Sequence, residues 1–444
     1  MLDIKLIRDS PDIVRKNLEK RHNKEKMKML EELIVKDKRR LDLLKAVEEL
    51  RKQRNIITKE ISNLVAQGKG KEQAFETVKK AQKDIKPFQQ VKDIGAQIKN
   101  KEEQLTELTT ETNALLIKLP NMLHDTVPTG RDDKENVEVR RGGKKPKFTF
   151  QPKGHAEILQ ALGMLDMERG AKVAGHGFYY LKGDAAILDM SLQRFALDFL
   201  RKQGFMVIEP PLMLARKPYE GVTSLEDFEN VMYKIEGQDL YMIATSEHPM
   251  AAMQMDEVII KKELPLLCAG ISPCFRKEVG AHGKYTKGLF RVHHFNKIEQ
   301  FVFCLPEQSS KWHEQLQKNS EQLYKQLGLH YRVVNVCTGD IGDIAAKKYD
   351  IECWMADGEF RETGSNSNCT DYQARSLNIK YREKEGQPPA GFVHTLNNTA
   401  LATSRTLVAL IEQNQKKDGT VAIPKALQKY TGFKILEMPR KAKR

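Results

Sequence analysis

The chain has 444 residues, and its formal net charge is +14 because 74 Lys and Arg stand against 60 Asp and Glu. This length exceeds what one hydrophobic core usually supports, so we expect at least two structural units. The positive charge favours a large polyanion as a partner, while the absence of a long uncharged apolar run argues against a membrane span. Charged residues at positions 3 and 5 interrupt any secretory signal, so a cytoplasmic location is expected.

The first residues predict a strand followed by a helix. Ile4, Leu6 and Ile7 form a short strand-like run, and Asp9-Ser10-Pro11 is typical of a helix N-cap with proline in the first turn. We therefore expect a helix from Pro11 onward.

Residues 24–118 predict a long antiparallel helical hairpin, because apolar residues recur there at alternating spacings of four and three in a sequence rich in Lys, Glu, Leu and Gln. Gly68 and Gly70 are expected to end the first helix, and Pro87 to kink or restart the second helix near Ile85. The residues expected to pack together are Leu43, Val47, Leu50, Arg54, Ile57, Ile61 and Leu64 in the first helix and Ile94, Ile98, Lys101, Leu105, Leu108, Thr112 and Leu115 in the second.

This predicted arm would extend ~60 Å at about 1.5 Å per residue, so reach is its expected purpose. Between Arg51 and Asn100 it carries twelve Lys or Arg against five Asp or Glu, which suits a phosphate backbone. A dimerisation coiled coil with a solvated basic face fits the same residues equally well.

The remainder of the chain predicts a second, mixed domain. Residues 131–147 are rich in Gly, Pro and paired charges and predict a linker, after an N-terminal domain of residues 1–130. In residues 148–436, β-rich runs and amphipathic helices alternate irregularly, which favours antiparallel strands. The expected fold class is α+β, an antiparallel β-sheet core flanked by helices and preceded by a long antiparallel α-helical coiled-coil arm. Residues 437–444 form a basic tail.

The cysteines and histidines do not predict a metal centre. No Cys-x-x-Cys pair occurs, so we expect buried, reduced thiols and no structural zinc. His293 and His294 are adjacent rather than four residues apart on a helix face, which favours a structural role. The six cysteines are at positions 268, 274, 304, 337, 353 and 369.

A basic hairpin is the first candidate for a binding site. Cys268–Phe275 and Val292–Phe303 predict two strands joined by a Gly-containing loop. Charged residues in and beside this loop could surround a polyanion such as a triphosphate, although a solvated surface hairpin fits them equally well. The chain contains no Gly-x-x-x-x-Gly-Lys-Ser/Thr loop and no Gly-x-Gly-x-x-Gly fingerprint after a strand. The charged residues are Arg276, Glu278, Lys284, Lys287 and Arg291.

Three further passages place polar residues in apolar surroundings. They are Thr245-Ser246-Glu247, Phe360–Asn368 and His394–Thr399, and the last of them runs on to Arg405. Each polar group needs a partner if it is buried. Turns and helix caps are the more frequent use of such residues, but together with the basic hairpin the three passages predict a pocket.

Three ordered motifs carry a resemblance to a known family. Lys202–Leu212 matches the first motif of the class II aminoacyl-tRNA synthetases, Phe275–Glu299 matches the second, and Asn397–Arg405 matches the third. With the basic arm in front of these motifs, the whole chain resembles a seryl-tRNA synthetase, in particular the archaeal branch of that family. The chain departs from the usual pattern at Asn366, where relatives usually have cysteine, and at Asn398-Thr399-Ala400, where many have Gly-Ser-Gly.

The resemblance implies a serine–tRNA ligase, which activates L-serine with ATP and Mg²⁺ to seryl-adenylate. The serine then passes to the 3′ end of tRNA(Ser), and of tRNA(Sec) where that tRNA is present. A homodimer built on the first motif and a tRNA-reading arm are also implied. A paralogue that charges a carrier protein would lack the arm, and a non-catalytic binder would have lost Arg276, Glu362 or Arg405, which are all present.

The resemblance also implies roles for individual residues. Arg276 would hold the α-phosphate and the serine carboxylate, Arg405 the γ-phosphate, and Glu362 the Mg²⁺ ion together with Ser365, so the first three are the implied catalytic residues. Phe295 would stack on adenine with Arg405 on the other face. The implied serine-binding residues are Thr245, Ser246, Glu247, Arg276, Glu299, Asn397 and Thr399. The implied ATP-binding residues are Arg276, Lys277, Glu278, Val292, Phe295, Glu362, Thr363, Gly364, Ser365 and Arg405.

Overall fold

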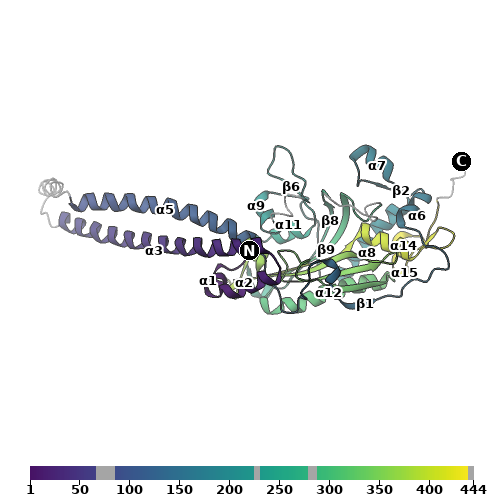
Figure 1. Ribbon diagram of the computed structural model, residues 1–444. Helices are drawn as coiled ribbons and strands as arrows, with labels where there is room; N and C mark the ends of the chain where they lie inside the picture. The colour runs from purple at the N-terminus through teal and green to yellow at the C-terminus, as the bar shows by residue number, and fades with distance from the viewer. Residues whose placement is uncertain (67–85, 225–230, 279–287, 439–444) are drawn as a thin grey trace. The chain divides into compact units, whose positions relative to one another are not determined.

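The computed structural model describes residues 1–66, 86–224, 231–278 and 288–438 (Figure 1). The chain forms two compact units. The helical unit contains residues 3–19 and 23–119, and the larger unit contains residues 1–2, 20–22 and 120–444. Among the described residues, no helix is both long and apolar enough to cross a membrane.

The helical unit begins with two short helices, α1 (Ile4–Asp9) and α2 (Pro11–Lys20). The prediction of a strand at the start of the chain is therefore wrong. Asp3 caps α1 by accepting a hydrogen bond from the Lys5 N–H at 2.8 Å, and Ile4 and the buried Ile7 lie one helical turn apart. The predicted helix start at Pro11 is confirmed.

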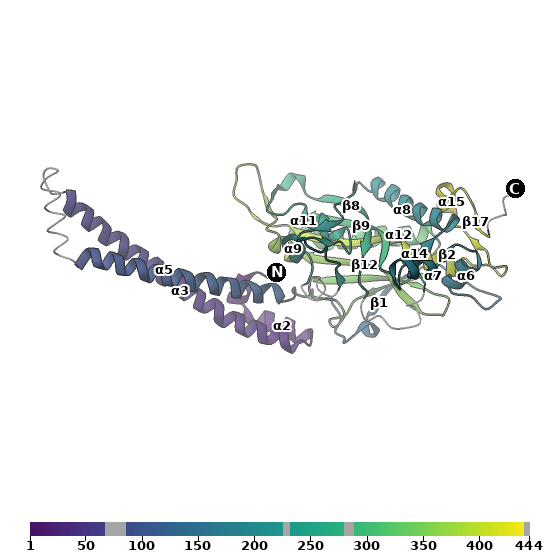
Figure 2. The same cartoon turned by 90° about the horizontal axis from the view of Figure 1, so that it is seen from above.

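The predicted arm is confirmed as two long helices that lie side by side, α3 (Lys24–Ala66) and α5 (Lys86–Lys118) (Figures 1 and 2). The residues predicted to pack together are buried or half-buried wherever the structure describes their side chains. Ion pairs join the two helices at Lys36 with Glu111 and at Arg51 with Glu102, with N–O distances of 2.8 and 2.6 Å.

The second long helix starts where the proline predicts a restart. α5 begins at Lys86, which places Pro87 in its first turn, where the missing N–H of proline has no cost. The predicted reversal at Gly68 and Gly70 lies outside the described residues, as does most of the predicted basic tail.

The larger unit is built on an eight-stranded sheet with the order β1-β10-β11-β12-β15-β9-β8-β4. Neighbouring strands are antiparallel except for β4 and β8, which pair in parallel. This sheet, with its flanking helices, confirms the predicted α+β fold class. The strands span Val137–Gly142 (β1), Met206–Ile208 (β4), Leu266–Phe275 (β8), His294–Cys304 (β9), Tyr331–Asn335 (β10), Lys347–Trp354 (β11), Phe360–Thr370 (β12) and His394–Ala402 (β15).

The first strand of this sheet corrects the predicted linker. Strand β1 lies within residues 131–147, yet it pairs with β10 and forms one edge of the sheet. Its six residues are exposed or half-buried, and as an edge strand it is paired on one side only. The segment therefore belongs to the sheet rather than to a connection between domains.

Helices pack against the sheet and enclose the main hydrophobic core. The largest contacts with the central strands come from α8 (Asp184–Lys202), α12 (Ser309–Gln326) and α14 (Thr403–Gln413). The six cysteines are all free and buried, as predicted. The remaining elements are α6 (His155–Ala161), β2 (Leu165–Asp166), α7 (Met167–Ala174), β3 (Tyr180–Leu181), β5 (Met213–Leu214), α9 (Arg216–Glu220), β6 (Tyr241–Met242), α11 (Glu247–Ala252), β7 (Val258–Ile260), α13 (Tyr372–Ser376), β13 (Lys380–Arg382), β14 (Gly391–Phe392), β16 (Val421–Ala422), α15 (Lys425–Thr431) and β17 (Ile435–Leu436), with short 3-10 turns at Asp133–Glu135, Lys261–Glu263 and Pro306–Gln308.

The adjacent histidines have the structural role that their spacing predicts. His293 stacks on Phe178 and His294 stacks on Tyr179, with ring centroids 4.8 and 5.0 Å apart. The backbone of His293 also exchanges hydrogen bonds with its surroundings: its carbonyl accepts from the Arg276 N–H at 2.9 Å, and its N–H donates to Gly177 at 3.1 Å. The pair thus fixes the base of the hairpin formed by β8 and β9.

Candidate active site

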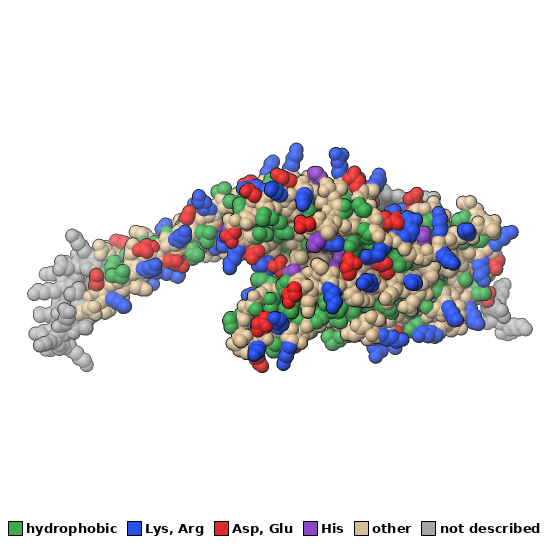
Figure 3. Space-filling view, turned by 90° about the horizontal axis from the view of Figure 1, so that it is seen from below, with side chains coloured by type: hydrophobic (Ala, Val, Ile, Leu, Met, Phe, Trp, Pro, Cys, Tyr) green, Lys and Arg blue, Asp and Glu red, His purple; other side chains and the backbone are tan. Residues whose placement is uncertain are grey.

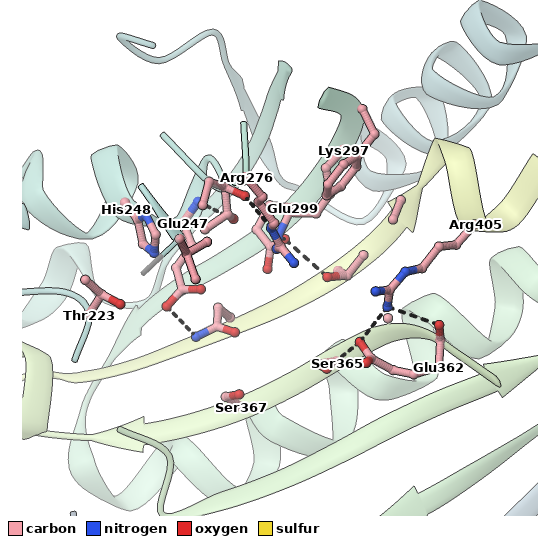
Figure 4. A pocket seen from close by; sticks show the side chains of 18 of the residues that line it. Thr223, Glu247, His248, Arg276, Lys297, Glu299, Glu362, Ser365, Ser367 and Arg405 are labelled. Carbon is pink, nitrogen blue, oxygen red and sulfur yellow. Dashed lines mark hydrogen bonds and ion pairs between the residues drawn. The ribbon is translucent and has the colours of Figure 1, made fainter. Parts of the chain in front are cut away.

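A pocket of about 430 Å³ lies against the four central strands of the sheet, β11, β12, β15 and β9 (Figure 4). Successive side chains of a strand point to opposite faces, so alternate residues of each strand reach the same wall. Phe295, Lys297 and Glu299 do so on β9, and Asn397 and Thr399 do so on β15. The pocket is therefore formed by sequence passages that are far apart in the chain.

Most residues implied to bind substrates line this pocket. Ser246 and Val292 are buried outside its wall, and Glu278 forms an ion pair with Arg291 at 3.2 Å. Lys277, likewise, does not line the pocket, and the predicted loop lysines at 284 and 287 lie outside the described residues. The implied residues in the wall are Thr245, Glu247, Arg276, Phe295, Glu299, Glu362, Thr363, Gly364, Ser365, Asn397, Thr399 and Arg405.

Sequence reasoning missed several residues of the wall. Lys297 could have been found, because it alternates with Phe295 and Glu299 along a predicted strand. Lys348 could not, since its place depends on the pairing of β11 with β12, where it lies opposite Ser367. Ser367 belongs to the predicted passage Phe360–Asn368 but was given no role of its own. The missed residues are Thr223, Val231, Met232, Ala244, His248, Lys297, Lys348 and Ala402.

Two buried carboxyl groups occupy one end of the pocket (Figure 4). The Glu299 carboxylate lies 2.5 Å from the Lys297 ammonium group and accepts a hydrogen bond from the Thr399 hydroxyl at 3.4 Å. The same Oε1 atom of Glu247 accepts hydrogen bonds from the side-chain amides of Asn397 at 2.9 Å and Gln373 at 3.0 Å. Both carboxyl groups are thus held in place by neighbours on other elements.

Burial changes the acidity of these two carboxyl groups. Burial and, to a smaller extent, the nearby charge of Glu299 together raise the pKa of Glu247 to about 7. Burial also raises the pKa of Glu299, against the opposing effect of Lys297. This end of the pocket can therefore gain or lose a proton near neutral pH.

The opposite end of the pocket combines arginine with an acidic residue. The Arg405 guanidinium lies 3.1 Å from the Glu362 carboxylate, which also accepts a hydrogen bond from the Ser365 hydroxyl at 3.3 Å. Burial opposes the charge on Glu362, but the positive charges of Arg405, Lys348 and Arg276 prevail and lower its pKa. Glu362 is therefore a carboxylate at neutral pH, and its side chain is 44% exposed.

The aromatic residue of the second motif lies against an arginine. The Arg276 guanidinium carbon is 5.3 Å from the centroid of the Phe295 ring, and that of Arg405 is 4.9 Å from the Phe290 ring. Phe295 and Arg405 both line the pocket, so the implied adenine sandwich between them stays a prediction.

Asn366, the unusual asparagine of the polar passage Phe360–Asn368, points away from the pocket. The Asn366 amide donates to the His313 carbonyl at 2.9 Å and to the Gln317 side chain at 3.2 Å, both on α12. Asn366 is fully buried. It therefore ties β12 to the helix behind the sheet and leaves the wall of the pocket unchanged.

Comparison with known proteins identifies the family. Residues 1–123 match the model of the seryl-tRNA synthetase N-terminal domain, and residues 231–414 match that of the tRNA synthetase class II core domain (G, H, P, S and T). The chain is 52% identical over 432 residues to a serine–tRNA ligase of Methanocella arvoryzae, covering 97% of this chain and 98% of that protein.

Two crystal structures share the fold over nearly the whole chain. The seryl-tRNA synthetase from Pyrococcus horikoshii complexed with ATP has 45% identity and a TM-score of 0.92, covering 99% of this chain and 100% of that one. The cytoplasmic serine–tRNA ligase from Naegleria fowleri in complex with AMP has 34% identity and a TM-score of 0.86, covering 99% of each chain. As its motifs predict, the chain belongs to the seryl-tRNA synthetase family of class II aminoacyl-tRNA synthetases.

Proposed function

We propose that this pocket carries out both steps of serine–tRNA ligation. The chain is a serine–tRNA ligase, which joins serine to tRNA with the use of ATP. The observation that supports this proposal is that Arg276, Glu362 and Arg405 line the same cavity as the carboxyl groups of Glu247 and Glu299. Groups that can neutralise phosphate and groups that can bind an ammonium ion thus face the same space.

Arg276 is the residue that brings the reactants together. In the first step a serine carboxylate oxygen attacks the α-phosphorus of ATP, and the bond from that phosphorus to the bridging oxygen of pyrophosphate breaks. Both reactants are anions and repel each other unless cations neutralise them. Arg276 lies between Glu247 and Arg405 (Figure 4), and its planar guanidinium can donate to a carboxylate and a phosphate at once.

Serine is held by the two buried carboxyl groups. The bonds from Asn397 and Gln373 both reach one oxygen of Glu247, which leaves the other oxygen for the serine ammonium group. Glu299 and the Thr399 hydroxyl, 3.4 Å apart, bind the serine hydroxyl, while Thr245 lines the wall and the adjacent Ser246 is buried outside it. Alanine is rejected because it would leave these polar groups without a partner.

Mg²⁺ fits the other end of the pocket. The exposed Glu362 carboxylate and the adjacent Ser365 hydroxyl match an ion that takes one or two carboxylates together with substrate phosphates. These two residues would hold the ion, which supplies positive charge at the phosphates. Arg405 holds the γ-phosphate and covers one face of adenine, and Phe295 covers the other. The remaining proposed nucleotide contacts are Lys277, Glu278, Val292, Thr363 and Gly364.

The second step transfers serine to tRNA. The terminal ribose hydroxyl attacks the seryl carbonyl carbon, AMP leaves, and the adenylate phosphate accepts the hydroxyl proton. We assign the binding of tRNA(Ser), and of tRNA(Sec) where it is present, to the N-terminal domain of residues 1–130. The arm carries Lys and Arg along its described length (Figure 3), with Arg51, Lys52 and Lys99 exposed. The apolar seam of α3 is filled by α5, which argues against the alternative of a dimerisation coiled coil.

A homodimer in the cytoplasm is the proposed working form. The first motif contains β4, an edge strand of the sheet, and it exposes Met206, Val207 and Leu212. Helix α8, which contacts β4, exposes Ile187 and Met190. Apolar side chains gathered near a sheet edge are typical of a protein interface. The cytoplasmic relative from Naegleria fowleri supports the location.

A serine-dependent exchange of pyrophosphate into ATP tests the proposal. We expect Arg276→Ala to abolish exchange, because the loss of a charge-stabilising donor costs about 10²–10³ in rate. Arg332→Ala is the matched control, since Arg332 pairs with Glu352 away from the pocket. Equal exchange in the two variants would exclude Arg276 from the reaction. A second assay, the charging of purified tRNA, distinguishes a serine–tRNA ligase from a paralogue that charges a carrier protein.

A further inference from the structure

Two buried residues outside the pocket, His155 and Glu412, connect α14 to Leu289, which precedes strand β9. The Glu412 carboxylate accepts hydrogen bonds through one oxygen from the backbone N–H and the Nδ1 atom of His155, at 3.0 and 2.7 Å. Its other oxygen accepts from the Ala356 N–H at 2.8 Å. On the far side of the ring, the Leu289 N–H donates to the Nε2 atom of His155 at 3.0 Å.

These contacts determine where the imidazole carries its proton. The backbone N–H of Leu289 can only donate, so Nε2 must accept and the ring proton lies on Nδ1, facing Glu412. Glu412 and His155 are 0% and 3% exposed. The negative charge of Glu412 is thus balanced by three N–H donors, and both nitrogens of the ring have a partner.

Helix α14 also contacts Phe290, the residue that follows Leu289. Arg405 lies in the first turn of α14 and Glu412 near its end. The Arg405 guanidinium lies over the ring of Phe290 at 4.9 Å, and Phe290 directly follows Leu289. The helix therefore contacts two consecutive residues, once through the His155 bridge and once through Arg405 itself.

Gly288 and Leu289 leave little room for the His155 side chain to move. Gly288 has a φ of +88°, and a Cβ atom at this position would lie 2.2 Å from the His155 Nε2 atom. Leu289 is buried in the main core. The imidazole, the glycine backbone and the leucine side chain thus fit together in one arrangement.

We propose that His155 and Glu412 are positioning residues for ATP binding. By holding Leu289 in place they fix the Phe290 ring on which Arg405 lies, and they thereby orient the guanidinium toward the nucleotide. The inference rests on the proposed role of Arg405 at the γ-phosphate and adenine. Neither residue of the bridge lines the pocket, so they act through Arg405 and not on the substrate.

Pyrophosphate exchange with His155 variants tests the bridge. We expect His155→Ala to raise the KM for ATP about tenfold, since small misplacements of a binding group have effects of this order or larger, while the KM for serine changes less than about twofold. His155→Gln keeps an acceptor for the Leu289 N–H and is expected to recover most of the ATP affinity.

Gln413→Leu is the matched control. Gln413 is the next residue of α14 and is also buried, but its side chain bonds to His330 and Trp354. We expect this variant to lower thermal stability as much as His155→Ala does and to leave the KM for ATP unchanged. Equal effects of both variants on the KM for ATP would overturn the inference, because they would reduce the role of the bridge to general stability.

A double-mutant cycle distinguishes this inference from the assignment on which it rests. If His155 acts through the aromatic ring, the effects of His155→Ala and Phe290→Leu on the KM for ATP are not additive, and additive effects would contradict the inference. Arg405→Ala is measured in parallel. An unchanged KM for ATP in that variant would refute the proposed role of Arg405, whatever the cycle gives.

Discussion

Lys297 and Glu299 project from the same face of β9 and form an ion pair with 2.5 Å between the ammonium nitrogen and the carboxylate oxygen, and both side chains are less than 10% exposed. We expect Lys297→Met to destabilise the protein by about 3–5 kcal/mol, because it leaves a buried charge without its partner. Urea denaturation measures this loss. The double variant Lys297→Met, Glu299→Gln should recover most of it, and equal stability of the single and double variants would contradict the prediction.

Serine binding should depend on pH through Glu247. The pKa of this group is raised to about 7 by burial and by the charge of Glu299, and the serine ammonium group needs the ionised form. The KM for serine is therefore expected to fall as the pH rises from about 6 to about 8, while the KM for ATP stays constant. Glu247→Gln should bind serine weakly at every pH, and a pH profile like that of the unaltered chain would show that another group titrates.

The same shift predicts how Glu247 affects folding. Its pKa in the folded protein lies above the ordinary value of 4.5, so the folded state retains a proton that the unfolded chain releases. The contribution of Glu247 to stability is complete at acid pH and is lost as the pH rises from about 4.5 through about 7. We expect the difference in free energy of unfolding between Glu247→Gln and the unaltered chain to grow over this window, in favour of the variant, and a constant difference would refute the assignment.

Glu362→Gln should weaken the binding of Mg²⁺ and lower the rate of exchange together. Loss of the carboxylate removes the proposed ion ligand and the partner of Arg405, so we expect exchange to fall about 100-fold or more and to require a higher Mg²⁺ concentration. Glu352→Gln is a suitable control because Glu352 lies opposite Glu362 in the sheet register and pairs with Arg332. Similar Mg²⁺ titrations for the two variants would exclude Glu362 as the ligand.

Shortening the arm should separate the two steps. Joining Leu50 to Lys101 through a short glycine linker removes residues 51–100. The ion pair of Arg51 with Glu102 shows that α3 and α5 lie side by side at this position, so the linker has a short distance to span. We expect exchange to be unchanged and tRNA charging to be lost, and charging by the full chain to weaken steeply with salt. Loss of exchange in a shortened chain that still folds would contradict the division of labour between the two domains.

The sequence predicted those parts of the structure that depend on local patterns. The seam of the arm repeats at fixed spacing, so Val47 and Ile98 could be assigned to it without coordinates. Ile4 and Ile7 could not be assigned in the same way, since three apolar residues in four positions fit a strand and a helix alike, and the N-cap bond of Asp3 decides between them.

The parts that could not be predicted depend on pairing between distant segments. Lys348 enters the pocket because of the register of β11 against β12, and Gln373 reaches Glu247 from another helix. Strand β1 has only two apolar residues, Val137 and Val139, and both are exposed, so its place at the edge of the sheet depends on its pairing with β10. The resemblance named twelve of the residues that line the pocket, but it gave no information about the bridge between His155 and Glu412.

Strand β15 presents Asn397 and Thr399 to the pocket, while Asn398 between them accepts a hydrogen bond at 3.1 Å from the Ser320 hydroxyl on α12, behind the sheet. Inserting or deleting one residue just before this strand segment would exchange the two sets of side chains. A change of length by one residue in this stretch is therefore expected to turn Asn397 and Thr399 away from the pocket, whereas a substitution alters one wall position at a time.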